Sequence, residues 1–241
     1  MLEALRSRAS HAGLLLDFDG TLSEVVARPE LARPVPGARD ALAGLVGIYA
    51  LVAVITGRRA EEVATLLDVD GVSYEGLYGM QEAAPELAFA VLPQVEAAAS
   101  IEAAAWVEDK GASVAVHYRQ ATDPGAARSA LVAALAPVAA SAGLELAEGK
   151  RVIELVPPDR PLKGGAVERL AGEWALEAAL VAGDDLADLD AFDALDRLAE
   201  RGLLTLKVAV RGEETPEELL DRADIVVEGP ARLVELLGRL V

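Results

Sequence analysis

Residues 14–22 read Leu-Leu-Leu-Asp-Phe-Asp-Gly-Thr-Leu, and this stretch decides the fold. Its first three residues, with Gly13 before them, form a short apolar run of the kind found in a buried strand of a parallel sheet. Asp17 and Asp19 follow, and the Gly-Thr pair after them suits a tight turn. Ligands of open α/β sheets bind outside the carboxyl ends of the strands, where both carboxylates would lie. The stretch is therefore a candidate active site. The alternative is an Asp-Gly hairpin turn, which is disfavoured because no alternating strand follows.

The composition is that of a folded protein with a strongly acidic surface. Of the 241 residues, 53% are hydrophobic, and 22 basic against 40 acidic residues leave a formal net charge of −18. Such a surface repels nucleic acid and anionic lipid, so we expect neither as a partner. The absence of cysteine excludes disulfides, thiol nucleophiles and thiolate metal sites. We expect a cytoplasmic protein, because residues 1–12 lack the apolar core of a signal peptide and no uninterrupted apolar run approaches the roughly 20 residues of a membrane helix. We also expect a monomer.

Both ends of the chain alternate strand patterns with helix patterns. After the first strand, apolar strand patterns recur at residues 49–55, 72–77, 178–182, 204–210 and 225–227. Apolar residues at helical spacing occur at residues 37–46, 60–67, 163–173, 191–201 and 230–240. This alternation predicts a Rossmann-like α/β core with a parallel sheet and right-handed crossovers.

The middle of the chain has a different pattern. A helical stretch at 91–105 leads into strand alternation within 106–120, and a second helix over 124–140 precedes a hairpin-like turn at Glu148-Gly149. We interpret the block as an inserted, smaller α+β domain. The expected boundaries are residues 84–158 for this domain and residues 1–83 with 159–241 for the catalytic core.

Four polar patches fall at predicted strand ends or at a helix start. All-oxygen ligands without histidine suit Mg²⁺, held together with a substrate phosphate. An ammonium at a helix start favours an anion. A nucleophilic carboxylate beside a second carboxylate that serves as acid and base suits an aspartyl-phosphate route. The patches are Asp17 with Asp19, Thr56-Gly57, Lys163, and Asp184 with Asp185.

Each patch taken alone also has a structural interpretation. Asp184 and Asp185 would cap the helix that follows them, and Lys163 would be a solvated surface charge. Thr56-Gly57 would be a strand-end turn, while Asp188 and Asp190 would lie in a first helical turn. All four patches, however, occur in the order that an α/β fold would bring together, and this agreement favours an active site over the separate structural interpretations.

Four segments resemble the motifs of the haloacid dehalogenase superfamily of phosphatases: residues 17–22, Thr56-Gly57-Arg58, Lys163-Gly164 and Gly183-Asp184-Asp185. Within that superfamily the chain is similar to trehalose-6-phosphate phosphatases over nearly its whole length. The middle block carries the more specific resemblance, to cap-domain motifs at residues 107–111, 117–119 and 149–154. Tyr78-Gly79 stands where the family commonly has His-Gly, and Leu189 stands where it has Glu.

This resemblance implies an Mg²⁺-dependent phosphatase of trehalose 6-phosphate, with the middle block as its cap. It implies Asp17 as nucleophile and Asp19 as general acid and base, with Mg²⁺ on Asp17, on the Asp19 carbonyl and on Asp184. Phosphate would contact Thr56, Gly57 and Lys163. The implied sugar-binding residues are Arg58, Glu108, Lys110, His117, Arg119 and Glu154.

Other interpretations stay open. By composition alone, Glu108, Lys110 and Arg119 could equally form ion pairs on a solvated sheet face. The substrate could be another glycosyl phosphate, such as sucrose 6-phosphate or a mannosyl- or glucosyl-3-phosphoglycerate. A phospho-acceptor signalling domain is disfavoured, because Asp19 as a general base would hydrolyse the phosphorylated aspartate quickly. A catalytically silent regulatory partner of a sugar-phosphate synthase is the remaining alternative.

Overall fold

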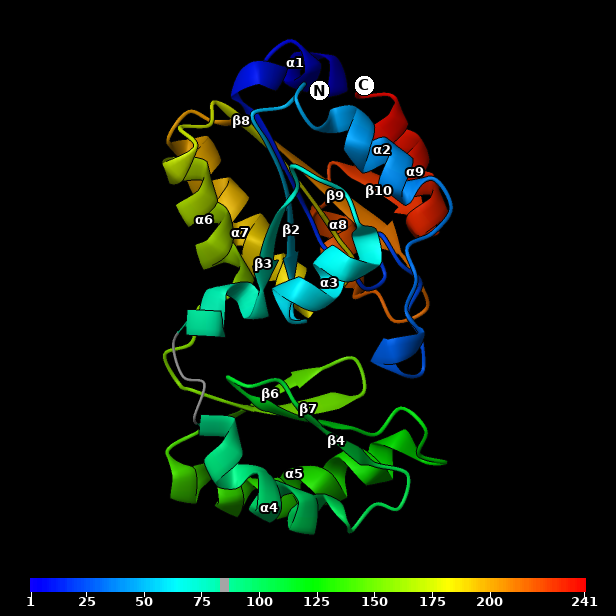
Figure 1. The fold of residues 1–241 in the computed structure, drawn as a ribbon, viewed down its shortest axis with the longest axis vertical. Helices are drawn as coiled ribbons and strands as arrows, with labels where there is room; N and C mark the ends of the chain where they lie inside the picture. Colours follow the sequence, from blue (N-terminus) through cyan, green and yellow to red (C-terminus); the bar gives the residue numbers. More distant parts are fainter. Residues whose placement is uncertain (83–86) are drawn as a thin grey trace. The chain divides into compact units, whose positions relative to one another are not determined.

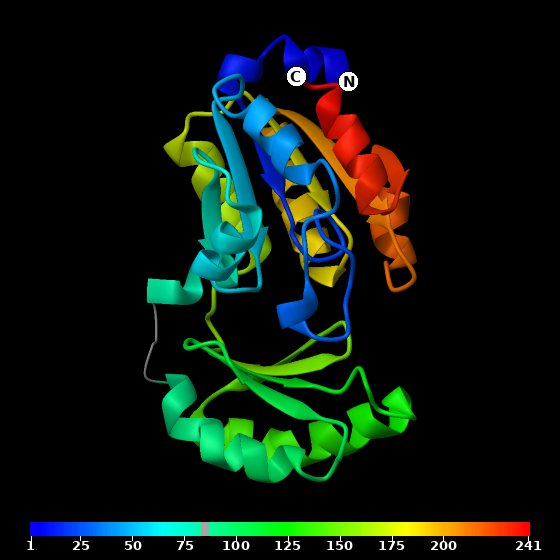
Figure 2. The same cartoon turned by 45° about the vertical axis from the view of Figure 1, so that its right-hand side comes forward.

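The computed structural model describes residues 1–82 and 87–241, which form two compact units (Figures 1 and 2). The first unit comprises Met1–Tyr78 and Pro161–Val241, and the second comprises Gly79–Arg160. The first expected domain boundary, at residue 84, lies outside the described residues. The assignment of the units as catalytic core and cap remains a prediction.

The first unit is built on a six-stranded sheet in the order β10-β9-β8-β1-β2-β3, with every neighbouring pair parallel. The strand that leads into Asp17, β1, therefore lies between β8 and β2. The strands are Ala12–Leu16 (β1), Leu51–Thr56 (β2), Ser73–Gly76 (β3), Ala178–Gly183 (β8), Leu204–Arg211 (β9) and Ile225–Glu228 (β10). The predicted parallel α/β core is confirmed.

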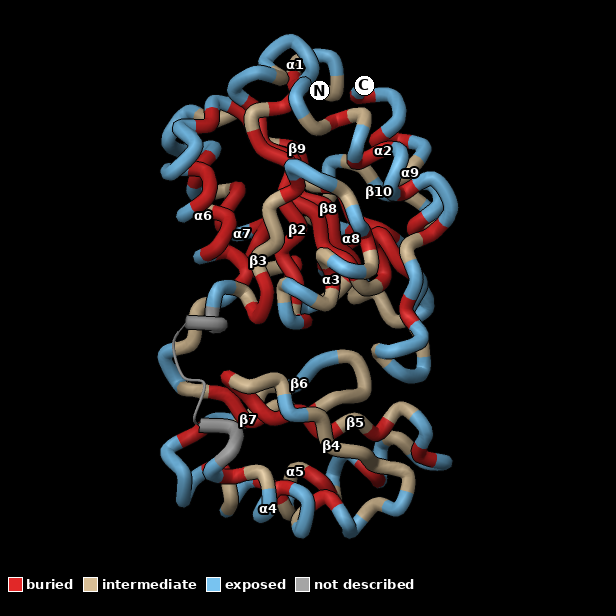
Figure 3. Tube along the Cα trace, viewed as in Figure 1, coloured by how far each residue is buried: buried red, intermediate tan, exposed pale blue. Residues whose placement is uncertain are grey.

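Helices cover both faces of this sheet. Leu14 and Leu16 pack on one face in a cluster with α2, α3 and α9, and Leu15 packs on the other with α6, α7 and α8. Because both faces are covered, the strands β1, β2 and β8 are buried along their whole length instead of alternating. Figure 3 shows many of the buried residues in this sheet. The helices are Ala38–Leu45 (α2), Ala60–Leu67 (α3), Lys163–Glu173 (α6), Leu186–Glu200 (α7), Glu217–Arg222 (α8) and Gly229–Gly238 (α9).

The two ends of the chain lie side by side in the first unit (Figures 1 and 2). Arg6, at the end of α1 (Leu2–Arg6), donates from Nη2 to the carbonyl oxygen of Val241 at 3.2 Å. Tyr49 donates from its hydroxyl to the carbonyl of Leu240 at 3.3 Å. Short 3₁₀ segments complete this unit and its junction with the next: Ala9–His11 (η1), Pro29–Leu31 (η2) and Leu77–Glu82 (η3).

The second unit has a four-stranded antiparallel sheet in the order β4-β5-β7-β6. Leu131 and Leu135 of α5 pack against one face of it, with Val116 and Ile153. On the other face, Ala115 is the register partner of both Glu108 and Glu154, so these three residues share that face. The elements are Leu87–Ala99 (α4), Trp106–Asp109 (β4), Val114–His117 (β5), Pro124–Ala142 (α5), Glu145–Gly149 (β6) and Val152–Val156 (β7).

Several expected element boundaries are wrong. The strand pattern over 106–120 is a hairpin of two strands, β4 and β5, and the helix expected from residue 191 begins at Leu186. Helix α8 was not expected. The early start of α7 follows from Asp185, whose carboxylate caps its first turn.

One helix among the described residues, α5, meets the length and composition criteria for a membrane span, with 19 residues and a mean hydropathy of 1.3. Arg128 and Pro137 interrupt its apolar sequence, which is why no uninterrupted run of this length is evident in the sequence. Leu131 and Leu135 are fully buried beneath the antiparallel sheet. We therefore interpret α5 as a core helix.

Candidate active site

The carboxyl ends of three neighbouring strands bring the sequence motifs of the first unit together. Asp17 follows β1 directly, and its backbone N–H donates to the carbonyl of Ala182 in β8 at 2.9 Å, so the sheet fixes its position. Thr56 is the last residue of β2, and Gly183, the last of β8, precedes Asp184. Since β1 pairs with both other strands, these ends meet at one edge of the sheet. The sequence-based placement of Asp17, Thr56 and Asp184 at strand ends is confirmed.

A lysine lies at the centre of this edge. Lys163, the first residue of α6, is 2% exposed, and its Nζ lies 2.7 Å from Asp17 Oδ1 and 2.6 Å from Asp188 Oδ1. Burial by itself lowers the pKa of Lys163, but the carboxylates of Asp17 and Asp188 outweigh burial, so the net pKa lies well above its ordinary value. Lys163 is therefore a buried cation, and the interpretation as a solvated charge is wrong.

Three buried carboxylates surround the same point. Oxygen atoms of Asp17, Asp184 and Asp188 all lie within 4.8 Å of one another. Burial raises the pKa of Asp17, the Lys163 ammonium opposes that effect, and the carboxylates of Asp188, Asp185 and Asp184 add to it, so the net pKa is well above its usual range. One ammonium cannot neutralise three carboxylates. A divalent cation would offset the remaining repulsion, and oxygen ligands of this kind suit a hard cation.

The adjacent acidic residues 184 and 185 have different functions. The side chain of Asp185 accepts from the backbone N–H groups of Ala187 at 2.8 Å and Asp188 at 3.3 Å, which makes it the N-cap of α7. Asp184 is 2% exposed and lies in the carboxylate cluster, where Thr21 Oγ1 donates to its Oδ1 at 3.4 Å. The capping interpretation therefore holds for Asp185.

Asp188 belongs to this site, although sequence reasoning gave it only a place in the first helical turn. It is fully buried, and its Oδ2 accepts from the backbone N–H groups of Asp184 at 2.8 Å and Asp185 at 3.0 Å. Its other oxygen contacts Lys163. Asp188 thus joins the ammonium to the backbone that carries Asp184. The sequence did contain a signal for this role: Asp188 follows Asp184 by four residues, and this spacing places both aspartates at the start of the same helix.

Two glycines make room for these carboxylates. A Cβ at Gly20, whose φ is +83°, would overlap the carboxylate of Asp184, and a Cβ at Gly183 would overlap that of Asp188. Any larger residue at either position would displace an acidic side chain. The turn after Asp19 therefore requires glycine for its backbone conformation and for space.

Asp19 faces an arginine. Arg58 donates from Nε to Asp19 Oδ2 at 2.6 Å and from Nη2 to Asp19 Oδ1 at 2.8 Å, a bidentate pair. The side chain of Asp19 is 38% exposed, whereas that of Arg58 is 9% exposed. Sequence reasoning places Arg58 among the sugar-binding residues, and that assignment remains a prediction.

Tyr78 lies beside the residues expected to bind phosphate. Its hydroxyl is 3.1 Å from the position of a Cβ built on Gly57, and the Nζ of Lys163 is 6.0 Å from the centre of its ring. Burial raises the pKa of Tyr78 well above its ordinary value. Thr56 is 1% exposed and accepts at Oγ1 from the backbone N–H of Arg58 at 3.1 Å. The ring of Tyr78, at the position where the family commonly has histidine, therefore lies within cation–π distance of the buried ammonium.

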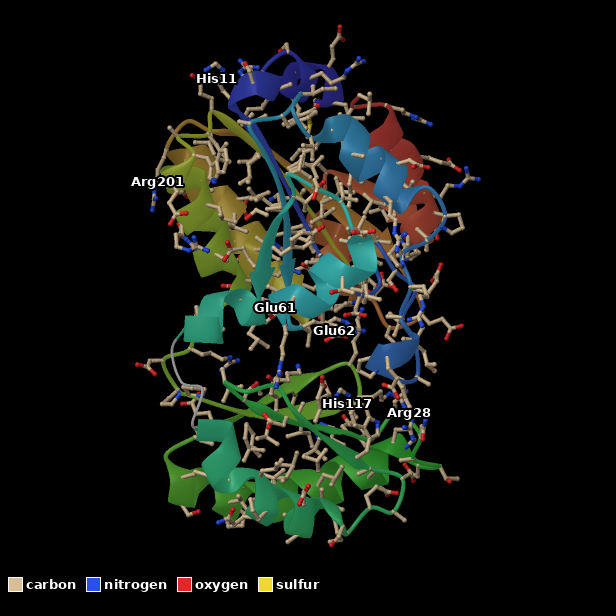
Figure 4. All side chains as sticks on the ribbon, viewed as in Figure 1. His11, Arg28, Glu61, Glu62, His117 and Arg201 are labelled. Atoms are coloured by element: carbon tan, nitrogen blue, oxygen red, sulfur yellow. The ribbon has the colours of Figure 1, made fainter. Side chains whose placement is uncertain are left out.

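The polar face of the second unit's sheet holds most of the other predicted residues in pairs. His117 Nε2 lies 2.8 Å from Glu108 Oε2, and the His117 ring stacks on Trp106 with centroids 4.0 Å apart (Figure 4 labels His117). Lys110 donates to Glu154 Oε2 at 3.3 Å. Ser113 donates to the other oxygen of Glu154, and Arg119 donates to the carbonyl of Lys150 at 2.8 Å. Trp106 and Ser113 are contacts that sequence reasoning missed.

Comparisons with known proteins show the family of this chain. The model of the trehalose-phosphatase family matches residues 15–221. The chain belongs to the trehalose-phosphatase family. It is 34% identical over 248 residues to a trehalose-phosphate phosphatase of Mycobacterium ulcerans, covering 94% of this chain and 60% of that protein. It is also 38% identical over 203 residues to an uncharacterized glycosyl hydrolase of Mycobacterium tuberculosis, covering 76% of this chain and 15% of that protein.

Among solved structures, the C-terminal domain of the trehalose-6-phosphate phosphatase of C. albicans has the same fold. The TM-score is 0.80 at 20% identity, with 99% of this chain and 94% of that chain covered. This chain thus spans less than two thirds of the length of the curated relatives just described, but nearly all of this solved domain.

Proposed function

We propose that the chain is a phosphatase that hydrolyses trehalose 6-phosphate to trehalose and phosphate. The observation that carries the proposal is the buried contact of Asp17 with Lys163 at the end of β1, beside the carboxylates of Asp184 and Asp188. Such a site offers a nucleophilic oxygen, a fixed positive charge for a phosphoryl group and ligands for a cation. Membership of the trehalose-phosphatase family supports the choice of reaction.

We propose Mg²⁺ as the cofactor. The excess of buried carboxylates over ammonium groups supports a divalent cation, and oxygen ligands support magnesium. Asp17, Asp184 and the backbone carbonyl of Asp19 would hold it, with Asp188 close to Asp184. When bound, the ion supplies positive charge that draws electron density from the phosphoryl group.

The proposed reaction has two steps. A carboxylate oxygen of Asp17 bonds to phosphorus, the bond from phosphorus to the sugar oxygen breaks, and a proton from Asp19 passes to that oxygen. Water then attacks the phosphorus of the aspartyl-phosphate, the bond from phosphorus to the Asp17 oxygen breaks, and a proton of the water passes to Asp19. One ester and one water become one alcohol and one phosphate, and both aspartates are restored.

Other residues would bind the two parts of the substrate. The Thr56 hydroxyl, the backbone N–H of Gly57 and the ammonium of Lys163 would hold the phosphate. The paired polar side chains of the second unit suit a sugar, because hydroxyl groups both donate and accept hydrogen bonds. The proposed sugar ligands there are Glu108, Lys110, His117, Arg119 and Glu154.

The partner that we propose is therefore a small sugar phosphate, and a cytoplasmic monomer remains the expected form. Another glycosyl phosphate is the second candidate substrate. The stacked rings of Trp106 and His117 support this second candidate, because an aromatic pair would accept many different sugars.

The test is phosphate release from a panel of sugar phosphates, with Mg²⁺ and with a chelator. The panel holds trehalose 6-phosphate, sucrose 6-phosphate, glucose 6-phosphate and glucosyl-3-phosphoglycerate. Selective, Mg²⁺-dependent release from trehalose 6-phosphate is the expected result. Preference for another member of the panel would assign that sugar phosphate as the substrate. No release from any member would favour the interpretation as a catalytically silent regulatory partner.

A further inference from the structure

The guanidinium of Arg58 is held by several contacts within the first unit. Nε and Nη2 donate to the two oxygens of Asp19, and Nη1 donates to the carbonyl of Pro29 at 3.0 Å and pairs with Glu62 of α3 (labelled in Figure 4). These contacts use four of the five N–H donors of a side chain that is only 9% exposed. A guanidinium committed in this way has little capacity left for sugar hydroxyls.

The position of Arg58 is coupled to the catalytic turn from a second direction. Its guanidinium lies over the ring of Phe18, 5.5 Å from the centroid, and Phe18 separates the two aspartates in sequence. The backbone N–H of Arg58 donates to Thr56 Oγ1, and its carbonyl accepts from Leu77 at 2.9 Å. Arg58 is thus fixed by its own backbone and by Phe18, so it can in turn hold Asp19.

We propose that Arg58 is a positioning residue, whose planar fork sets the direction of the Asp19 carboxylate for proton transfer to the departing oxygen. The inference rests on the proposed function, in which Asp19 is the acid. The side chain of Asp19 is 38% exposed, so the surrounding packing restrains it less than it restrains buried Asp17. Two parallel N–H···O contacts fix the plane of the carboxyl group as well as its distance, and each oxygen keeps a lone pair outside the fork that can carry the transferred proton. Arg58 acts on the reaction through Asp19 and touches no reacting atom.

A lysine would not replace Arg58. An ammonium is a point charge on a flexible stem, whereas a guanidinium presents two donors at the spacing of the two carboxylate oxygens. Arg58→Lys therefore keeps the charge and loses the bidentate contact, and Arg58→Ala loses both. Glu62→Gln is the matched control, because Glu62 contacts the far side of the same guanidinium without touching Asp19.

The proposal is tested by measuring how strongly kcat/KM depends on the leaving group of the substrate. Phenyl phosphate and p-nitrophenyl phosphate have nearly the same shape and no sugar, but the phenolate is the poorer leaving group and needs the proton more. General acid catalysis contributes about 10²–10⁴ in rate, so partial misplacement of Asp19 should lower the phenyl to p-nitrophenyl ratio of kcat/KM about tenfold in Arg58→Lys. Glu62→Gln should leave the ratio within about twofold of wild type. Added guanidinium should restore part of the ratio in Arg58→Ala.

Other results would overturn the proposal. An unchanged ratio in Arg58→Lys, with a loss confined to trehalose 6-phosphate, would make Arg58 a sugar ligand. An equal fall of both aryl substrates, or the same fall in Glu62→Gln, would make its role one of folding, which thermal melting of each variant would also reveal. A failure of the proposed function would look different: the wild-type protein would release no phosphate from trehalose 6-phosphate. The phenyl to p-nitrophenyl ratio of kcat/KM can still be measured in that case, because neither aryl substrate contains a sugar.

Discussion

The strand-end edge of the first unit and the polar sheet face of the second hold their charged groups in different ways. At the edge, the side chains of Lys163 and Asp188 are 2% and 0% exposed, and each charge meets an opposite charge or a backbone N–H. On the sheet face, the side chains of Glu108 and Glu154 are 24% and 20% exposed. Glu108 pairs with His117 of the neighbouring strand β5, and Glu154 pairs with Lys110, which follows β4. The charges at the edge are buried and held by ion pairs and backbone N–H groups, whereas those on the face are partly exposed and held by pairs of side chains.

This difference has consequences for energy and for function. Removing one member of a buried ion pair leaves an uncompensated charge and costs about 3–5 kcal/mol, while partly exposed pairs contribute about 1 kcal/mol or less. The edge therefore tolerates little change, as the proposed reaction requires. The sheet face can change its pairs at low cost, as a change of sugar preference requires.

The largest expected effect is at Asp17. Asp17→Asn keeps the shape of the side chain and removes the nucleophilic charge, so phosphate release should fall by at least about a thousandfold. Thermal melting and circular dichroism should show a retained fold, since Asp188 still pairs with Lys163. Turnover near that of wild type would remove Asp17 as the nucleophile.

The adjacent aspartates 184 and 185 should separate catalysis from stability. Asp184→Asn should lower phosphate release about a hundredfold and raise the Mg²⁺ concentration needed for half activity, since it weakens a ligand of the proposed ion. Asp185→Ala should instead lower the free energy of unfolding by about 1 kcal/mol, because α7 loses its cap. Mg²⁺ titrations and denaturant unfolding of both variants measure the two effects. Identical behaviour of the two would contradict this division.

A smaller and more selective effect is expected on the sheet face. Glu154→Gln should raise KM for the sugar phosphate about tenfold and leave KM for p-nitrophenyl phosphate unchanged. The reason is that the carboxylate would contact the sugar part of the substrate and not its phosphate. Glu148→Gln is the control: Glu148 is also on this sheet but pairs with Arg128 of α5. Equal loss of both substrates in Glu154→Gln would argue against a role in sugar binding.

The smallest effect is expected at Asp196, away from both regions. Burial raises its pKa, but hydrogen bonds and charges from Lys207 and Arg222 together outweigh burial and lower the pKa below its ordinary value. A carboxyl group whose pKa is lower in the folded than in the unfolded protein stabilises the fold at pH values above its pKa in the unfolded protein. This contribution is lost as the pH falls through its pKa in the folded protein. Because the side chain is 48% exposed, solvent screens the pairs, and Asp196→Asn should cost about 0.5 kcal/mol at pH 7. The difference between the melting curves of wild type and variant should shrink as the pH falls below the ordinary pKa of an aspartate. A difference that persists at the acid end of the range would exclude this cause.

Much of the core was predictable because local sequence determines it. An apolar run such as residues 13–16 can be buried only as a strand covered on both faces, and polar residues that follow such runs must lie at the carboxyl edge of a parallel sheet. The helices Ala60–Leu67 and Lys163–Glu173 have the boundaries expected from their apolar spacing. Asp17, Thr56, Lys163 and Asp184 were found in this way.

The tertiary structure decided which partner each polar side chain meets. Nothing in the order Asp184-Asp185 tells which carboxylate caps α7, because that depends on the direction in which the chain leaves β8. Asp188 reaches Lys163 and Arg58 reaches Asp19 only through the packing of α6 and α7 and the pairing of β1 with β2. The sequence by itself determined the strands, their polar ends and the family resemblance. The ion pairs were settled by side-chain directions that only the packed sheet and helices impose.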